Sequence, residues 1–151
     1  MMDDIDRRLL RLLQRDGRMT NVELAKHANL SQAATFERVR RLQRDGIIEG
    51  YTAKLNAAKL NCALLIFIEI TLDRTNSNIF EDFSTAVQRT PAIMECHMVA
   101  GGFDYLIKVR VSDMAAYRDF LGNTLVKLPG IRQTHTYAVM EEVKSTSDLP
   151  V

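Results

Sequence analysis

Apolar residues in the first third of the chain recur at the spacing of an amphipathic helix. One stripe, at intervals of four, three and one residues, consists of Ile5, Leu9, Leu12 and Leu13. It predicts a helix from about Asp3 to Arg15, because residues separated by four and seven positions share one helix face. The dipeptide Asp16-Gly17 is expected to end this helix.

Two further helices are predicted from their capping residues. Thr20 and Glu23 have the spacing of a capping box, so a short second helix is expected directly after Thr20. Ser31 is a favourable N-cap for a third helix, which is predicted to run to about Arg44. The apolar residues that follow predict a short strand or wing over residues 47–51.

The rest of the chain alternates between strand-like and helical patterns. Apolar residues fill nearly every position between 62 and 72, so this strand is expected to be covered on both faces. Its own helices are predicted to cover one face, and a partner subunit the other. The predicted elements are strand 62–72, helix 76–89, strand 93–100, strand 103–111, helix 113–126 and strand 131–143.

This order predicts an α+β protein, in which an N-terminal winged helix-turn-helix is followed by a ferredoxin-like βαββαβ regulatory domain. The predicted divisions are a helix-turn-helix domain over 1–50, a hinge over 51–61, the sheet domain over 62–144 and a polar tail over 145–151. The same sheet order suits acylphosphatases and amino-acid-binding regulatory modules. The fold alone therefore assigns no function.

Composition narrows the class of protein. Hydrophobic residues make up 46% of the chain and charged residues 26%, which is enough to build a globular core. No apolar run approaches the ~20 residues that span a bilayer, and the N-terminus lacks a signal-peptide pattern, so a cytoplasmic protein is expected. Cys62 and Cys96 have no partner Cys or His at ligand spacing, so we expect reduced thiols, no metal site and no cofactor.

The formal net charge of +1 combines a basic and an acidic part. Residues 1–61 contain 12 Lys and Arg against 8 Asp and Glu, which gives +4. Residues 62–151 contain 8 against 11, which gives −3. The asymmetry favours a polyanionic partner, such as DNA, for the first part of the chain.

The second and third predicted helices have the lengths and tight connection of a helix-turn-helix. DNA recognition needs a polar turn that enters the major groove, and cations that contact phosphates and base edges. The candidate DNA-binding residues are Ser31, Gln32, Ala33, Thr35, Phe36, Arg38, Arg40, Arg41 and Arg44. A helical bundle whose solvated arginines pair with Glu37 and Asp45 explains the charge and periodicity equally well. The capped turn favours DNA.

The segment 30–48 resembles the recognition helix of the leucine-responsive/asparagine-responsive regulator (Lrp/AsnC) family, and residues 4–6 and 21–25 match its first two helices. Gln32 stands where many members have proline; both suit a first helical turn. The resemblance implies a sequence-specific transcriptional regulator that binds double-stranded promoter or operator DNA. It also implies a homodimer, formed by pairing of the sheets, that assembles into higher oligomers such as an octamer.

Residues 101–105 resemble the family's Gly-x-x-Asp-Tyr segment, which lies beside an effector pocket between subunits. The resemblance implies a small-molecule effector, an amino acid or related metabolite, with Asp104 accepting from its α-ammonium group. The implied effector-binding residues are Gly101, Gly102, Phe103, Asp104, Tyr105, Thr134 and Thr136. From the residues alone, a tight hairpin with Asp104 in a surface pair and ordinary strand threonines is the alternative.

Catalytic motifs are absent from the sequence: no Ser-His-Asp set, HExxH, P-loop or GxGxxG pattern occurs. No catalytic residue is therefore assigned, and the protein is not expected to be an enzyme. The enzyme alternative is a siroheme decarboxylase, because such enzymes resemble this family in both domains. That alternative is disfavoured by the basic third helix, which a decarboxylase does not need.

Overall fold

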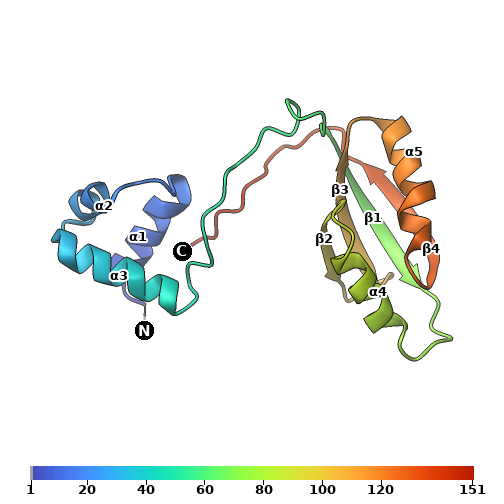
Figure 1. Ribbon diagram of the computed structural model, residues 1–151, viewed down its shortest axis with the longest axis horizontal. Coiled ribbons are helices and arrows are strands. Elements are labelled where there is room, and N and C mark those ends of the chain that lie inside the picture. Colours follow the sequence, from blue (N-terminus) through green and yellow to red (C-terminus); the bar gives the residue numbers. More distant parts are fainter. Residues whose placement is uncertain (1) are drawn as a thin grey trace. The chain divides into compact units, whose positions relative to one another are not determined.

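The computed structural model describes residues 2–151, which form two compact units (Figure 1). One unit comprises the chain up to Lys54 together with Lys144–Val151, and the other comprises Leu55–Val143. The helices are α1 (Asp4–Arg15), α2 (Asn21–Ala28), α3 (Gln32–Arg44), α4 (Ile79–Gln88), α5 (Met114–Asn123) and the short 3-10 helix η1 (Leu125–Lys127). The strands are β1 (Leu64–Leu72), β2 (Ile93–Met98), β3 (Tyr105–Val111) and β4 (Ile131–Ala138). No helix within residues 2–151 is long and apolar enough to cross a membrane.

The three predicted N-terminal helices are confirmed, and side-chain caps fix where each begins. The Asp3 carboxylate accepts a hydrogen bond from the Asp6 amide, and the Asp6 carboxylate accepts one from the Asp3 amide. The predicted capping box of Thr20 and Glu23 starts α2 in the same way. These caps satisfy amides that the first helical turn leaves without partners. The core of the unit is formed by Leu9, Leu13, Leu24 and Ala28.

The turn between α2 and α3 is tight. Asn29 takes a left-handed conformation (φ 56°), which ends α2, and Ser31 accepts a hydrogen bond from the Ala34 amide to begin α3. The Asn21 side chain donates to the backbone oxygen of Gln32 at 2.9 Å. That bond ties the first turn of α3 to the start of α2.

The segment predicted as a short strand or wing over residues 47–51 forms no strand. The amides of Ile47 and Ile48 both donate to the carbonyl of Leu42, so they close the end of α3 instead of pairing with another strand. Within the described residues this segment has no neighbouring strand, and extended backbone becomes a strand only when it pairs. The N-terminal unit is therefore a helix-turn-helix in which residues 47–51 do not form a strand.

The C-terminal tail packs on α1. Gln14 donates from its side-chain nitrogen to the Leu149 carbonyl at 3.1 Å, and its oxygen accepts from the Leu149 amide at 2.6 Å. Arg11 donates to the Val151 carbonyl at 2.8 Å. The polar tail therefore belongs to the helical unit, although it follows the sheet domain in the sequence.

The second unit is the predicted ferredoxin-like fold. Its antiparallel sheet has the order β2-β3-β1-β4, and α4 and α5 lie on the same face of the sheet (Figure 1). On the central strand β1, Ile66, Ile68 and Ile70 are completely buried beneath Phe83 of α4 and Tyr117 of α5. Each such aliphatic or aromatic side chain contributes about 1.5–3 kcal/mol when it is removed from water.

All six predicted elements of this unit are somewhat longer than the observed ones, and the last helix and the last strand end clearly earlier than predicted. The second helix of this unit ends at Asn123 and gives way to η1, because Gly122, Asn123 and Thr124 are poor helix formers. The last strand ends at Ala138 instead of continuing to 143. The amide of the next residue donates to the Leu65 carbonyl, near the start of β1, and beyond that point no partner strand remains.

Within the described residues, no helix of this unit covers the second face of the sheet. Leu65 on β1 is buried there, while Phe67 and Leu106 are half-buried among charged side chains. Tyr137 donates to Glu69 at 3.1 Å, and Lys108 pairs with Glu95 at 2.8 Å. The partner subunit expected on this face stays a prediction.

Candidate functional site

The first turns of α3 present an exposed polar face. Gln32, Phe36 and Arg40 lie four residues apart and therefore share one side of the helix. Gln32 and Arg40 are exposed, and 54% of the Phe36 surface is accessible. Ser31, Ala33 and Arg44 are exposed as well. Arg40 has no ion-pair partner within residues 2–151, so its charge is available to a ligand.

Thr35 is also in α3 but faces the protein interior. It is completely buried, and its hydroxyl donates to the Ser31 carbonyl at 3.0 Å. Burial removes Thr35 from the surface that DNA can reach. Its place is in the core beneath α3, where the bond to Ser31 stabilises the first turn.

Two of the arginines predicted to bind DNA hold α3 against α1. Arg38 contacts Asp3 at 2.7 Å and Asp6 at 2.9 Å, and Arg41 contacts the other oxygen of Asp6 at 2.5 Å. Asp6 is completely buried, so both arginines neutralise a charge in the interior. The Asp6 amide and Arg38 lower the pKa of Asp3, and these carboxylates raise the pKa of Arg38.

Arg44 is paired differently. It contacts the neighbouring Asp45 at 3.2 Å, and both side chains are well exposed. An exposed ion pair of this kind contributes little to stability, and Arg44 can readily exchange Asp45 for another partner. Glu37, the other acidic residue considered as a local partner, makes no ion pair with the α3 arginines among the contacts of residues 2–151.

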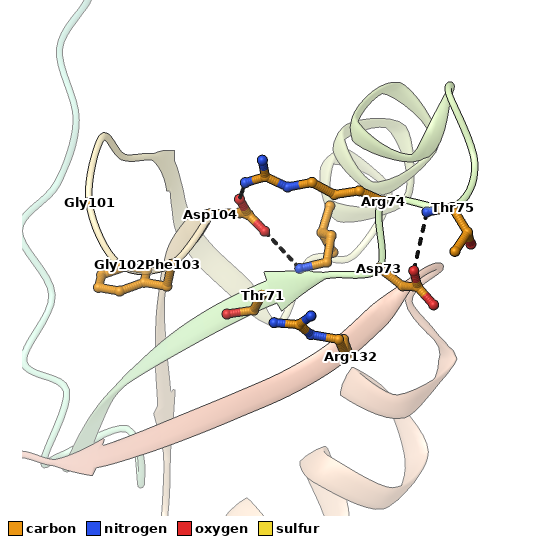
Figure 2. Close-up of a pocket in the computed structure, with 10 residues that line it drawn as sticks. Thr71, Asp73, Arg74, Thr75, Gly101, Gly102, Phe103, Asp104 and Arg132 are labelled. Carbon is orange, nitrogen blue, oxygen red and sulfur yellow. Dashed lines mark hydrogen bonds and ion pairs between the residues drawn. The ribbon is translucent and has the colours of Figure 1, made fainter.

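The glycine loop 101–104 forms one wall of a pocket of about 490 Å³ in the sheet unit (Figure 2). The C-terminal end of β1 and the residues that follow it form the opposite wall. The lining residues are Thr71, Leu72, Asp73, Arg74, Thr75, Gly101, Gly102, Phe103, Asp104 and Arg132. Four of the predicted effector-binding residues thus lie together, and their neighbours from β1 and β4 were not predicted.

Asp104 is part of the pocket wall and is already fully engaged. One oxygen accepts from the Leu72 amide at 2.8 Å, and the other contacts Arg74 at 2.6 Å (Figure 2). Its pKa is lowered, first by the Leu72 amide and then by Arg74, with a smaller effect from the charge of Arg132. Because both oxygens have partners, Asp104 braces the loop against β1 and has little capacity left for a ligand's ammonium group.

Tyr105, Thr134 and Thr136 do not line this pocket. Tyr105 is buried against the ring of Phe83, with the ring centroids 4.7 Å apart. Thr136 pairs with Ile68 across the strands and so lies on the helix-covered face, where its hydroxyl is 2.5 Å from that of Tyr117. The residue that β4 contributes to the pocket is Arg132, two positions before Thr134.

Comparison with known proteins now identifies the family. A family model described as the Lrp/AsnC ligand binding domain matches residues 65–149, and one described as winged helix-turn-helix DNA-binding matches residues 2–49. The leucine-responsive regulatory protein of Escherichia coli strain K12 is 55% identical over 150 residues, which cover 99% of this chain and 92% of that protein. The chain belongs to the Lrp/AsnC family. The resemblance inferred from residues 30–48 is thereby confirmed.

Solved structures of regulatory proteins share this fold. An AsnC family transcriptional regulator from Agrobacterium tumefaciens superposes with a TM-score of 0.94 at 33% identity, covering 99% of this chain and 97% of that one. A transcriptional regulator from Neisseria meningitidis, solved as a complex with L-Met, gives 0.94 at 32% identity with the same coverage. A feast or famine regulatory protein from M. tuberculosis, complexed with L-methionine, gives 0.88 at 33% identity and covers 99% of each chain.

Proposed function

We propose that this chain is a sequence-specific DNA-binding transcriptional regulator whose helix α3 enters the major groove of duplex DNA. The observation that carries this proposal is the exposed face of α3, on which Gln32, Phe36 and Arg40 follow one another at one-turn spacing. An amide and a cation on one helix face provide hydrogen bonds to base edges and a contact to phosphate. The proposed contact residues are Ser31, Gln32, Ala33, Phe36, Arg40 and Arg44.

Thr35, Arg38 and Arg41 have a supporting role in this proposal. Their contacts with Ser31 and with the carboxylates of α1 fix the orientation of α3. A recognition helix that is rigid before it binds loses less conformational entropy in the complex. These three residues therefore assist DNA binding by positioning the helix, without contacting bases.

The pocket beneath the glycine loop is proposed as the effector site. Its volume of about 490 Å³ lies in the range of small-molecule sites, roughly 300–1,000 Å³. Two relatives of the same fold were solved with L-methionine, and this supports an amino acid as the ligand. Gly101, Gly102, Phe103 and Asp104 keep their place in the proposed site, whereas Tyr105, Thr134 and Thr136 leave it.

A second copy of the chain is proposed to cover the helix-free face of the sheet. The half-buried apolar side chains of Phe67 and Leu106 on that face favour contact with another protein surface over water. A two-fold dimer would present two α3 helices to a pseudo-palindromic site. Higher assemblies such as an octamer are part of the same proposal.

A regulatory role replaces the enzyme alternative in this proposal. The relatives are named as transcriptional regulators, and nothing in the comparisons supports a siroheme decarboxylase. We infer that the protein acts in the cytoplasm, the compartment in which a regulator of this kind meets its DNA.

The decisive experiment is selection of fragmented genomic DNA by purified full-length protein, followed by sequencing. The wild type is expected to enrich a limited set of fragments that share a pseudo-palindrome. The double variant Gln32→Ala/Arg40→Ala is expected to lose this enrichment. Arg118→Ala is the control, because Arg118 is exposed on α5 in the other unit.

Addition of L-methionine or L-leucine to the same selection tests the effector. A coupled ligand is expected to change the affinity for selected fragments by about 5- to 150-fold.

Equal enrichment by the wild type and the double variant would contradict the assignment of α3. Unchanged affinity with every common amino acid would contradict the effector role and leave the DNA-binding role intact.

A further inference from the structure

We propose that Arg132 binds the carboxylate of a neutral α-amino acid in the pocket beneath the glycine loop, and that Asp73 faces its ammonium group. The inference rests on the proposed effector site and assigns the two charged groups that read the ligand there. It replaces the expectation that Asp104 receives the ammonium group.

A β-bulge aims Arg132 at the pocket. Thr71 of β1 pairs with Gln133 of β4, but the next residue, Leu72, pairs with Ile131. Arg132 is therefore an extra residue with no partner opposite it. Bulges of this kind redirect a side chain and are common next to functional sites. Figure 2 shows the Arg132 side chain extending from β4 toward Thr71, at the pocket.

Two of the four charged side chains that line the pocket neutralise each other, and the other two remain unpaired in the described part of the chain. Of the four charged lining residues, Asp104 and Arg74 pair with each other at 2.6 Å. Arg132 forms no ion pair or hydrogen bond through its side chain with any described residue. One oxygen of Asp73 accepts a hydrogen bond from the Thr75 amide at 3.2 Å. The other oxygen has no hydrogen-bond or ion-pair partner within residues 2–151.

One free cation and one free anion complement a zwitterion. A guanidinium matches the planar geometry of a carboxylate, and a carboxylate attracts an ammonium group. The remaining lining residues are uncharged, so no group is left to recognise a charged ligand side chain. This charge count favours a neutral amino acid over an acidic or a basic one.

The glycines keep the space for such a ligand open. A Cβ atom placed on Gly101 or Gly102 would meet no other atom within 4 Å, so the loop borders open space and not packed side chains. Thr71 and Phe103 line the same space with a hydroxyl and an aromatic ring. The pocket thus provides charged, polar and apolar contacts of the kinds that an amino acid offers.

Calorimetry with chemically edited ligands tests the assignment. The probes are L-leucine and L-methionine, the corresponding α-amides, which lack the carboxylate charge, and 4-methylpentanoate, which is leucine without its amino group. Arg132→Gln is expected to weaken binding of the amino acids by about tenfold or more, and to leave binding of the amides unchanged. Arg132→Lys is expected to keep part of the affinity because it keeps the charge.

Asp73→Asn provides the reciprocal test. It is expected to weaken binding of the amino acids while leaving 4-methylpentanoate unaffected, because that ligand has no ammonium group. Arg118→Gln and Asp119→Asn are matched controls on the exposed side of α5, and both are expected to bind like the wild type. Thermal unfolding of every variant confirms that each one is folded.

The outcomes separate the two proposals. If the wild type binds an amino acid and Arg132→Gln binds it equally well, Arg132 is not the carboxylate group and this inference is overturned. Equal loss of amide and amino acid affinity in Arg132→Gln would also overturn it, because the effect would then not depend on the ligand's charge. If the wild type binds none of the common amino acids, the proposed effector function itself fails.

Discussion

Arg38 of α3 contacts Asp6 of α1 at 2.9 Å, and the Asp6 carboxylate has no exposed surface. The pair joins the proposed recognition helix to the helix that supports it. Replacement of Asp6 by Asn removes the charge that balances Arg38 and Arg41. We expect Asp6→Asn to lower the free energy of unfolding of the helical unit by about 1–3 kcal/mol, measured by urea denaturation.

Asp4→Asn is the control for that variant, because Asp4 is an exposed aspartate in the first turn of the same helix. Its effect is expected to stay within about 0.5 kcal/mol, as for other surface substitutions. Equal destabilisation by the two changes would mean that the helix dipole, and not the ion pair, accounts for the contribution of Asp6.

Arg40 and Arg41 are adjacent on α3 but are predicted to act differently. Arg40→Gln is expected to reduce the slope of log K against log salt by about 1, since an exposed arginine at a phosphate releases one counterion equivalent. Arg41→Gln is expected mainly to lower the free energy of unfolding, with a smaller change in the salt slope than Arg40→Gln gives. The reason is that Arg41 is engaged by Asp6. Binding titrations at several salt concentrations distinguish the two, and a reversed order would contradict the proposed orientation of α3.

The helical unit could be predicted from the sequence because its capping signals depend on residues only a few positions apart. The capping box of Thr20 and Glu23 and the N-cap at Ser31 depend on spacing of three residues, and both are present as expected. Pairing between Asp6 and Arg38 spans 32 positions, and a helical stripe of arginines contains no information about which of them it involves. The sequence therefore predicted the helix and overestimated how many of its arginines are free.

The pocket could be predicted only in part for a similar reason. The motif at residues 101–105 marked one wall. Arg132 enters the site through a bulge between β1 and β4, which exists only once those strands pair. The family resemblance implied Thr134 and Thr136, and the register of the sheet places Thr136 beside Ile68, with its hydroxyl against Tyr117 of α5.

Thr136→Val tests that placement. Loss of the hydroxyl leaves the buried Tyr117 without its partner, so we expect stability to fall by about 1 kcal/mol in thermal unfolding. Affinity for any amino acid that the wild type binds is expected to stay the same, because Thr136 does not line the pocket. A selective loss of ligand affinity with unchanged stability would return Thr136 to the effector site.

Asp104→Asn is predicted to act on stability in a pH-dependent way. The Leu72 amide and Arg74 hold the pKa of Asp104 below its ordinary value of 3.8, so the charged form stabilises the fold. At neutral pH the variant is expected to be about 1–2 kcal/mol less stable than the wild type. The difference should shrink as pH falls below about 3.8, when Asp104 takes up a proton in the wild type. Denaturation curves from pH 7 to 2 measure it, with Asp119→Asn as the surface control.

Gly130→Ala is predicted to be the most damaging of the glycine substitutions. Gly130 has φ +71°, and a Cβ there would lie 2.1 Å from Cδ1 of Ile79, a buried side chain at the start of α4. The variant therefore combines backbone strain with a forced rearrangement of Ile79, and we expect a loss of about 2–4 kcal/mol in thermal unfolding. Gly46→Ala is the matched control, since Gly46 has φ +72° but no atom within 4 Å of an added Cβ. It is expected to lose only about 1 kcal/mol. Equal losses would show that the left-handed backbone, and not contact with Ile79, requires glycine at position 130.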